Sequence, residues 1–170
     1  RRSKNGKSFL QKVKMETGLK LELIRPEEEA RLAVISCAPL FDPKFSHVLI
    51  VDIGGGSTEL VWMDLSEISE ENRIAEMLKL RLDKKNKKEF QIEKLNTNLV
   101  KIVDWISVPL GVATLLERYS DVDDDSARFA LMSCDFEQKI ENFLPYLNYD
   151  QIDLKKGLQI IGCLLYTSDA

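Results

Sequence analysis

The sequence predicts an α/β fold, in which helices and strands follow one another along the chain. Three observations support this prediction. Apolar residues recur at helical spacing within residues 5–18, whereas Val48–Ile53 is a nearly continuous run of β-branched residues, typical of a strand buried on both faces. Beyond the Gly54–Gly56 run, the residues Thr58–Met63 alternate as in a strand, which indicates a β-hairpin.

The first forty residues are expected to form a helix, a strand and a second helix. Gly18 is the expected cap of the first helix, because glycine readily adopts the left-handed conformation at a helix C-terminus. Apolar and charged residues nearly alternate in Leu19–Ile24, which predicts a short strand. Pro26 stands where a first helical turn prefers it, and Glu27–Glu29 follow at the positive end of a helix that should run to Cys37.

A charged segment follows the predicted hairpin. Leu65–Asn98 is rich in Glu and Lys, with one amphipathic stretch at Ile74, Met77, Leu78 and Leu82. We expect it to be an inserted surface excursion that protrudes as a helix or hairpin at the sheet edge with its lysines exposed. The sequence then predicts a strand at Val100–Val108, a turn at Pro109–Gly111 and a helix after it. The acidic residues Asp121–Asp125 should begin a longer helix, and Leu158–Ile161 should be one more buried strand.

The composition indicates a globular chain and limits its partners. The 170 residues are 44% hydrophobic and 31% charged, which is enough apolar material for one ordinary core or for parts of two. A formal charge of -4 gives no global field to attract polyanions, so no nucleic-acid partner is expected and any phosphate site must be built locally. No apolar run approaches the ~20 residues of a membrane span.

The cysteines and the single histidine argue against several kinds of site. Cys37, Cys134 and Cys163 lack the paired spacing of a zinc site or a disulfide framework, which favours a reducing, cytoplasmic setting. A Ser-His-Asp triad would depend on His47 alone. Because His47 stands just before an apolar strand, an ordinary loop histidine is the simpler interpretation.

The strongest chemical signal is the segment Asp52–Glu59, in which an acidic residue ends a buried strand and three glycines lead into Ser-Thr-Glu. Glycines without a Cβ let several backbone amides approach one oxyanion, and they can take positive φ. The Ser57 and Thr58 hydroxyls add donors, and Asp52 and Glu59 can hold Mg²⁺ against the same phosphate. The alternative is a hairpin that merely turns a strand. The flanking acidic and hydroxyl residues favour the phosphate site.

The glycine hairpin is accompanied by further motifs. Glu27–Leu32, which reads Glu-Glu-Glu-Ala-Arg-Leu, precedes Asp-Ile-Gly-Gly-Gly-Ser-Thr-Glu-Leu at Asp52–Leu60. The other motifs are Arg1 with Asn5 and Phe9-Leu10, Ser107-Val108-Pro109-Leu110-Gly111, and Glu117-Arg118. The hairpin alone is similar to that of the actin, sugar-kinase and Hsp70-like superfamily, where it binds nucleotide phosphates. Together, these motifs resemble more narrowly the exopolyphosphatase/guanosine pentaphosphate phosphohydrolase family.

The resemblance implies an actin-like ATPase (ribonuclease H-like) fold and a hydrolase. The implied reaction is Mg²⁺-assisted attack of water on the terminal phosphate of inorganic polyphosphate or of guanosine pentaphosphate. Its general base is Glu29, because the family's catalytic glutamate stands immediately before Ala-Arg-Leu. Spacing alone does not distinguish Glu29 from Glu27 and Glu28. The implied phosphate-binding residues are Arg1, Gly54, Gly55, Gly56, Ser57 and Thr58, and the implied metal ligands are Asp52 and Glu59.

We expect parts of two domains. Residues 1–46 would be the end of a first actin-like domain, and residues 47–162 the first part of a second. Family members have an Asp-x-Gly-Ser loop upstream of Arg1, so the chain is expected to be a truncated, inactive piece of a protein that forms a cytoplasmic homodimer. Residues 163–170 resemble translated sequencing adapter and are expected to be non-native. Thr114 stands where many members have an arginine, which leaves one phosphate contact open.

Two other functions remain open at this level. An ATP-dependent kinase of the same superfamily would use the same hairpin, and a non-catalytic regulator would bind a phosphate alarmone and contact a partner through the insertion. The basic cluster Lys84–Lys88 is expected to face water. In the hydrolase, Glu29 should meet the Asp52–Glu59 hairpin across an interdomain cleft, since a base must reach the water beside a bound phosphate.

Overall fold

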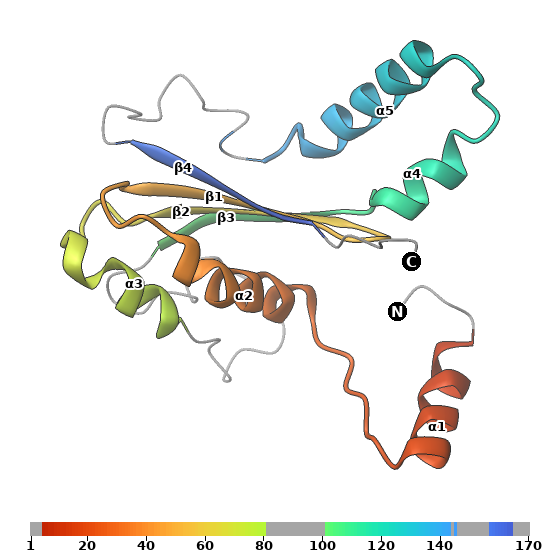
Figure 1. Cartoon of the computed structure of the whole chain (residues 1–170), viewed down its shortest axis with the longest axis horizontal. Coiled ribbons are helices and arrows are strands. Elements are labelled where there is room, and N and C mark those ends of the chain that lie inside the picture. Colours follow the sequence, from red (N-terminus) through yellow and green to blue (C-terminus); the bar gives the residue numbers. More distant parts are fainter. Residues whose placement is uncertain (1–4, 81–100, 144, 146–156, 165–170) are drawn as a thin grey trace.

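The computed structural model describes residues 5–80, 101–143, 145 and 157–164. Within these ranges the chain forms a mixed β-sheet with helices on both faces (Figure 1), which confirms the predicted α/β class. The helices are α1 (Gly6–Thr17), α2 (Pro26–Cys37), α3 (Glu70–Leu78), α4 (Val112–Arg118) and α5 (Asp125–Ile140), and the 3₁₀ turn η1 (Ala38–Leu40) follows α2. The strands are β1 (His47–Ile53), β2 (Thr58–Asp64), β3 (Lys101–Val108) and β4 (Leu158–Leu164). None of the helices described is long and apolar enough to cross a bilayer.

The strands lie in the order β3-β2-β1-β4. β1 and β2 pair antiparallel as a hairpin, β3 pairs antiparallel with β2, and β4 runs parallel beside β1. The predicted hairpin is therefore confirmed. Because successive side chains of a strand point to opposite faces, the register of these pairs decides which residues meet which helices.

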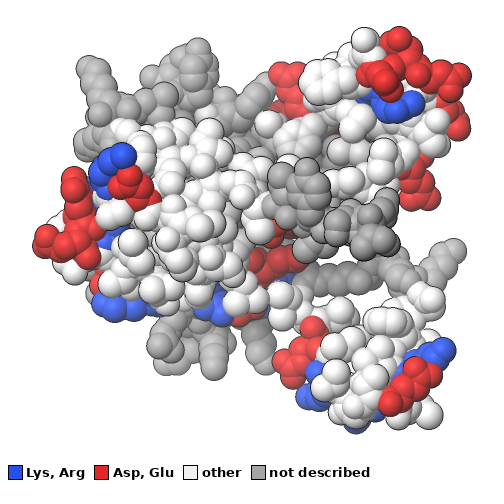
Figure 2. All heavy atoms as spheres, viewed as in Figure 1, with Lys and Arg blue, Asp and Glu red and all other residues white. Residues whose placement is uncertain are grey.

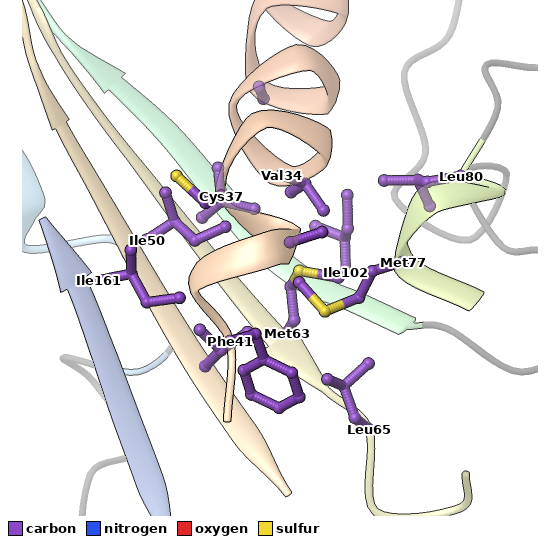
Figure 3. Close-up of a cluster of buried hydrophobic side chains, with 14 of the residues drawn as sticks. Val34, Cys37, Phe41, Ile50, Met63, Leu65, Met77, Leu80, Ile102 and Ile161 are labelled. Carbon is purple, nitrogen blue, oxygen red and sulfur yellow. The ribbon is translucent and has the colours of Figure 1, made fainter. Parts of the chain in front are cut away.

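The larger core lies between the sheet and the helices α2 and α3 (Figure 3). Val34 and Cys37 enter it from α2, Met77 from α3, and Ile50 and Met63 from the central strands. All five side chains are almost completely buried, and each apolar side chain of this size contributes roughly 1.5–3 kcal/mol by leaving water. This packing holds α2 against the sheet and thereby places its first turn.

A smaller cluster covers the opposite face of the sheet. Leu60 and Trp62 of β2 are buried there together with Phe143, and Phe136 and Ile140 of α5 pack against them. α5 therefore reaches the sheet through its C-terminal half. Figure 2 shows acidic side chains gathered around the far end of the arm that α4 and α5 form.

His47 has a structural role at the start of β1. Its ring is buried and stacks on Trp62 with the ring centroids 5.8 Å apart. Its Nδ1 lies 3.0 Å from the Ser46 hydroxyl, and its Nε2 lies 3.5 Å from a carboxylate oxygen of Asp64. Asp52 lies near the other end of the same strand, so His47 is remote from the predicted phosphate site.

The N-terminal segment keeps its predicted helix signals but not its predicted strand. Gly18 has φ 74° and its amide donates to the Lys14 carbonyl at 3.0 Å, as expected of a helix cap. Leu19–Ile24 belongs to no strand, and it connects α1 to α2 as an extended segment with exposed leucines (Figure 1). An alternating pattern forms a strand only beside a partner strand, and none pairs with it among the described residues.

The segment after β2 also differs from its prediction. Leu65, Ile68, Met77 and Leu80 are buried in the larger core, so the expectation of a surface excursion is wrong for residues 65–80. The amphipathic helix α3 puts its charged residues outward and its apolar residues inward. The rest of the predicted insertion, including Lys84–Lys88, lies outside the described residues.

Arg73 of α3 is a buried arginine whose hydrogen-bond partners among the described residues are all backbone carbonyls. Its Nε lies 3.2 Å from the Leu65 oxygen and 3.1 Å from the Ile68 oxygen. Its Nη1 donates to Pro43 at 2.6 Å and to Phe45 at 2.9 Å. Arg73 thus joins the loop before β1 to the turn after β2.

Replacing Arg73 with Met should leave these buried carbonyls without a donor and lower the free energy of unfolding by about 2–4 kcal/mol. Urea denaturation followed by circular dichroism measures the loss. The control is Arg118→Met, because the Arg118 side chain is 51% exposed. A loss for Arg73→Met no larger than for the control would show that the carbonyls find other donors.

An ion pair on α2 links this helix to the end of α3. Arg31 donates from Nε to Glu28 at 3.0 Å and from Nη2 at 2.5 Å, and its Nη1 donates to the Leu80 carbonyl at 3.1 Å. The hydrogen bonds from Arg31 lower the pKa of Glu28, and those to Glu28 raise the pKa of Arg31. Glu28 is therefore held as a carboxylate.

The lowered pKa of Glu28 predicts a pH-dependent contribution to stability. Glu28→Gln should lower the free energy of unfolding at neutral pH by about 1 kcal/mol, because both partners are partly exposed. The contribution is complete above pH 4.5, the ordinary pKa of this group, and is lost as the pH falls through the lower folded value. The deficit of the variant should therefore shrink in acid. A deficit in urea denaturation that stays constant down to about pH 3 would contradict the assignment.

Candidate active site

The three glutamates of the first turn of α2 have different surroundings. Glu28 is paired with Arg31. Glu27 has a carboxylate oxygen that is buried without a hydrogen bond, 3.9 Å from the Arg25 Nε. Glu29 is exposed and lines two neighbouring cavities. The structure therefore distinguishes the three residues that spacing alone left equivalent.

The larger of the two cavities, about 520 Å³, joins Glu29 to the glycine hairpin. Gly56, Ser57 and Glu59 line it from the hairpin, and Glu29 lines it from α2. The other lining residues are Glu22, Leu23, Ile24, Pro26, Ser107 and Thr114. Glu29 and these hairpin residues thus line one cavity, as expected, and the location of this cavity between two domains stays a prediction.

The smaller cavity, about 220 Å³, brings Glu29 together with Asp52. Cys37 and Cys163 line the same space. Burial raises the pKa of the Cys37 thiol, and the negative charge of Asp52 raises that of Cys163. Both thiols are therefore protonated at neutral pH and are poor nucleophiles. The carboxylates around these cavities belong to Glu22, Glu29, Asp52 and Glu59.

Asp52, Glu59 and Ser107 form a row across three strands. Asp52 pairs with Glu59 between β1 and β2, and Glu59 pairs with Ser107 between β2 and β3, so all three face the α2 side of the sheet. Glu59 is 4% exposed, and its Oε1 accepts a hydrogen bond from the Ser107 hydroxyl at 2.9 Å. Within the described residues neither carboxylate has an ion pair with a lysine or an arginine.

This donor set fits Mg²⁺. The described residues contain no cluster of three or more acidic, histidine or cysteine side chains arranged to enclose a metal. Mg²⁺ does not need one, since it keeps several waters and usually binds one or two carboxylates together with substrate phosphates. Two adjacent carboxylates without a basic partner, one of them oriented by a hydroxyl, meet that requirement.

The glycine turn is open on its cavity side. The Gly54 amide donates to the Ser57 carbonyl at 2.9 Å, whereas the amides of Gly55 and Gly56 have no acceptor among the described residues. None of these glycines has a positive φ. The expectation that the turn needs glycine for a positive φ is therefore wrong. A Cβ added at Gly55 or Gly56 would meet nothing within 4 Å. The fold itself does not require glycine at these two positions, and their bare amides leave room for a ligand to approach.

Two predicted phosphate-binding residues are placed differently. Thr58 is 2% exposed, and its hydroxyl donates to the Leu110 carbonyl at 2.7 Å. It therefore fastens the hairpin to the turn before α4, and it does not line the cavity. Arg1 lies outside the described residues.

The sequence-based prediction gave too little weight to Ser107 and Thr114. Both residues line the larger cavity. Ser107 was visible only as the first residue of Ser-Val-Pro-Leu-Gly, and its bond to Glu59 depends on the strand register. The hydroxyl of Thr114 accepts from the Gly111 amide at 2.7 Å and donates to the Gly111 carbonyl at 3.0 Å. Thr114 therefore closes the first turn of α4.

Known proteins resemble this chain in sequence. A sequence profile of the Ppx/GppA phosphatase family matches residues 1–145. Exopolyphosphatase 1 of Mycobacterium tuberculosis (strain ATCC 25618 / H37Rv) is 35% identical over 80 residues, which are 47% of this chain and 22% of that protein. Exopolyphosphatase 1 of Mycobacterium leprae (strain TN) is 35% identical over 60 residues, 35% of this chain and 18% of that protein. The chain thus spans 22% or less of these curated relatives.

A solved structure agrees with the fold. The crystal structure of an exopolyphosphatase-like protein superposes on 94% of this chain and on 39% of its own, with a TM-score of 0.61 and 19% identity. At this identity the likeness concerns the fold, and together with the mixed sheet it confirms the predicted actin-like architecture. The profile match covers both the glutamate motif of α2 and the glycine hairpin. The chain therefore belongs to the Ppx/GppA phosphatase family.

Proposed function

We propose that the full-length protein hydrolyses the terminal phosphoanhydride bond of a phosphate chain. One observation carries the proposal: Glu29 shares a cavity with Gly56, Ser57 and Glu59. Hydrolysis of this bond needs a phosphate held in place, a water aligned with it and stabilisation of the developing charge. The cavity offers one group for each of these tasks.

Glu29 acts as the general base. Its carboxylate accepts a proton from water as the water oxygen bonds to the terminal phosphorus, and the bridging P–O bond breaks so that a chain shorter by one phosphate leaves. Glu28 is unsuited to this role because Arg31 binds both of its carboxylate oxygens. Glu27 does not line the cavity.

The glycine turn binds the terminal phosphate. The open amides of Gly55 and Gly56 and the hydroxyl of Ser57 are donors suited to an oxyanion. By family resemblance Arg1 supplies a cation to the same phosphate. Asp52 and Glu59 hold Mg²⁺, and the bound ion would neutralise part of the phosphate charge.

Inorganic polyphosphate is the proposed substrate, because the curated relatives are exopolyphosphatases. Guanosine pentaphosphate ends in the same phosphoanhydride and is the second substrate to test. A kinase of the same superfamily would need an acceptor, so release of phosphate from polyphosphate without any acceptor distinguishes hydrolysis from phosphate transfer.

The full-length protein is also expected to form a homodimer. Measurement of its molecular mass in solution tests this expectation.

Replacing Glu29 with Gln in the full-length protein should lower kcat by about 10²–10⁴-fold, because the shape remains and the proton acceptor is lost. Polyphosphate binding should survive, since the amides and the carboxylates opposite are unchanged. Phosphate release and equilibrium binding of polyphosphate give the two measurements.

Glu28→Gln is the matched control, because it makes the same chemical change one residue away and outside the cavity. It should retain turnover at a temperature where the variant is folded. A similar loss in both variants would assign the effect to the structure of α2, and a fully active Glu29→Gln enzyme would exclude Glu29 as the base.

Glu59→Gln and Ser107→Ala should both weaken metal binding, because the first removes a ligand charge and the second frees the ligand from its hydrogen bond. For Ser107→Ala we expect a loss of roughly 10-fold in affinity. Electron paramagnetic resonance of bound Mn²⁺ measures the metal affinity directly. Excess Mg²⁺ should partly restore the activity of both variants. Ser107→Thr keeps a hydroxyl and serves as the control. Equal rescue of Glu29→Gln by Mg²⁺ would show that the roles of the two glutamates are interchanged.

A further inference from the structure

The first turn of α4 donates its amides into the glycine turn. The amide of Val112 donates to the Gly54 carbonyl at 3.0 Å, and those of Ala113 and Thr114 donate to the Gly55 carbonyl at 2.9 and 3.2 Å. The first amides of a helix usually have no partner within the helix and often bind anions. Here the hairpin itself occupies them, so α4 does not serve as the phosphate site.

These bonds determine where the glycine amides point. In a trans peptide the C=O and N–H bonds point in opposite directions, and the described residues contain no cis peptide. The Gly54 carbonyl shares a peptide with the Gly55 amide, and the Gly55 carbonyl shares one with the Gly56 amide. Since both carbonyls point at α4, both amides point away from it, and Gly56 lines the larger cavity.

Gly111 is what allows α4 to lie so close. A Cβ at this position would lie 2.4 Å from the Gly54 oxygen and 2.6 Å from both the Gly55 carbonyl carbon and the Ser57 nitrogen. The backbone of Gly111 is extended, with φ −133°, so any residue could adopt its conformation. The requirement for glycine at this position is therefore the close contact with the hairpin.

We propose that α4, docked through Gly111, positions the two phosphate-binding amides of the hairpin and responds to their occupancy. A phosphate that accepts from the Gly55 and Gly56 amides polarises their peptides, which makes the Gly54 and Gly55 carbonyls stronger acceptors for α4. Ligand binding should thus tighten the first turn of α4. Gly111 is a positioning residue in this scheme, and the inference rests on the proposed function only for the identity of the ligand.

Hydrogen exchange of the full-length protein tests this coupling. The probe is imidodiphosphate with Mg²⁺, in which nitrogen replaces the bridging oxygen, so that the ligand persists. Exchange at the amides of Val112–Thr114 should slow several-fold on binding, while the amides of α1 should not respond. Gly111→Ala should weaken imidodiphosphate binding by roughly tenfold or more, because the turn must shift. Gly6→Ala is the control, since a Cβ there meets nothing within 4 Å.

Two results would overturn the proposal: binding of imidodiphosphate without a change in exchange at Val112–Thr114, or wild-type affinity in a folded Gly111→Ala variant. If Gly111→Ala does not fold, two other measurements test the proposal. The first is hydrogen exchange of the wild-type protein. The second compares Thr114→Val, which loses both hydrogen bonds to Gly111, with Thr114→Ser, and Thr114→Val should bind imidodiphosphate more weakly. Protection of α4 without any turnover would refute the proposed hydrolysis and leave this inference standing. Absence of imidodiphosphate binding to the wild-type protein would contradict both the proposed function and this inference.

Discussion

The register between β1 and β2 determines both the core and the candidate site. Asp52 opposes Glu59 in this pairing, and Ile50 opposes Val61 two residues earlier in β1. The alternation that buries Ile50, Val61 and Met63 beneath α2 also directs the two carboxylates towards the first turn of that helix. A slip of β2 by one residue against β1 would turn Glu59, Val61 and Met63 to the α5 face, away from Asp52 and Ile50. The chain therefore cannot form its core in this register without assembling its carboxylates.

Stability and chemistry lie at opposite ends of the same strands. At the start of β1, His47 stacks on Trp62, and Arg73 binds the neighbouring loop carbonyls, so polar groups there are satisfied within the fold. At the end of β1, the amides of Gly55 and Gly56 have no acceptor among the described residues. Both glycines are exposed, so these amides are open to solvent, and a phosphate with its metal ion could bind beside the carboxylates.

The sequence predicted features set by neighbouring residues and missed those set by distant ones. The Gly18 cap and the β1–β2 hairpin depend on local conformation, and both form as predicted. Leu19–Ile24 has the alternation of a strand, but strand formation depends on a partner that local sequence does not specify. In residues 65–80, the prediction gave more weight to the charge density than to the amphipathic pattern, whose apolar side is buried. The choice of Glu29 among three glutamates came from family resemblance, and the cavity now gives it a geometric reason.

The central claim is that Glu29 and the glycine turn act on the same phosphate. The most direct test is a crystal structure of the full-length Glu29→Gln protein with inorganic triphosphate and Mn²⁺. The account predicts the terminal phosphate at the amides of Gly55 and Gly56, anomalous density for Mn²⁺ beside Asp52 and Glu59, and an ordered water between that phosphate and residue 29. A terminal phosphate bound elsewhere, or a residue 29 side chain turned away from it, would contradict the claim.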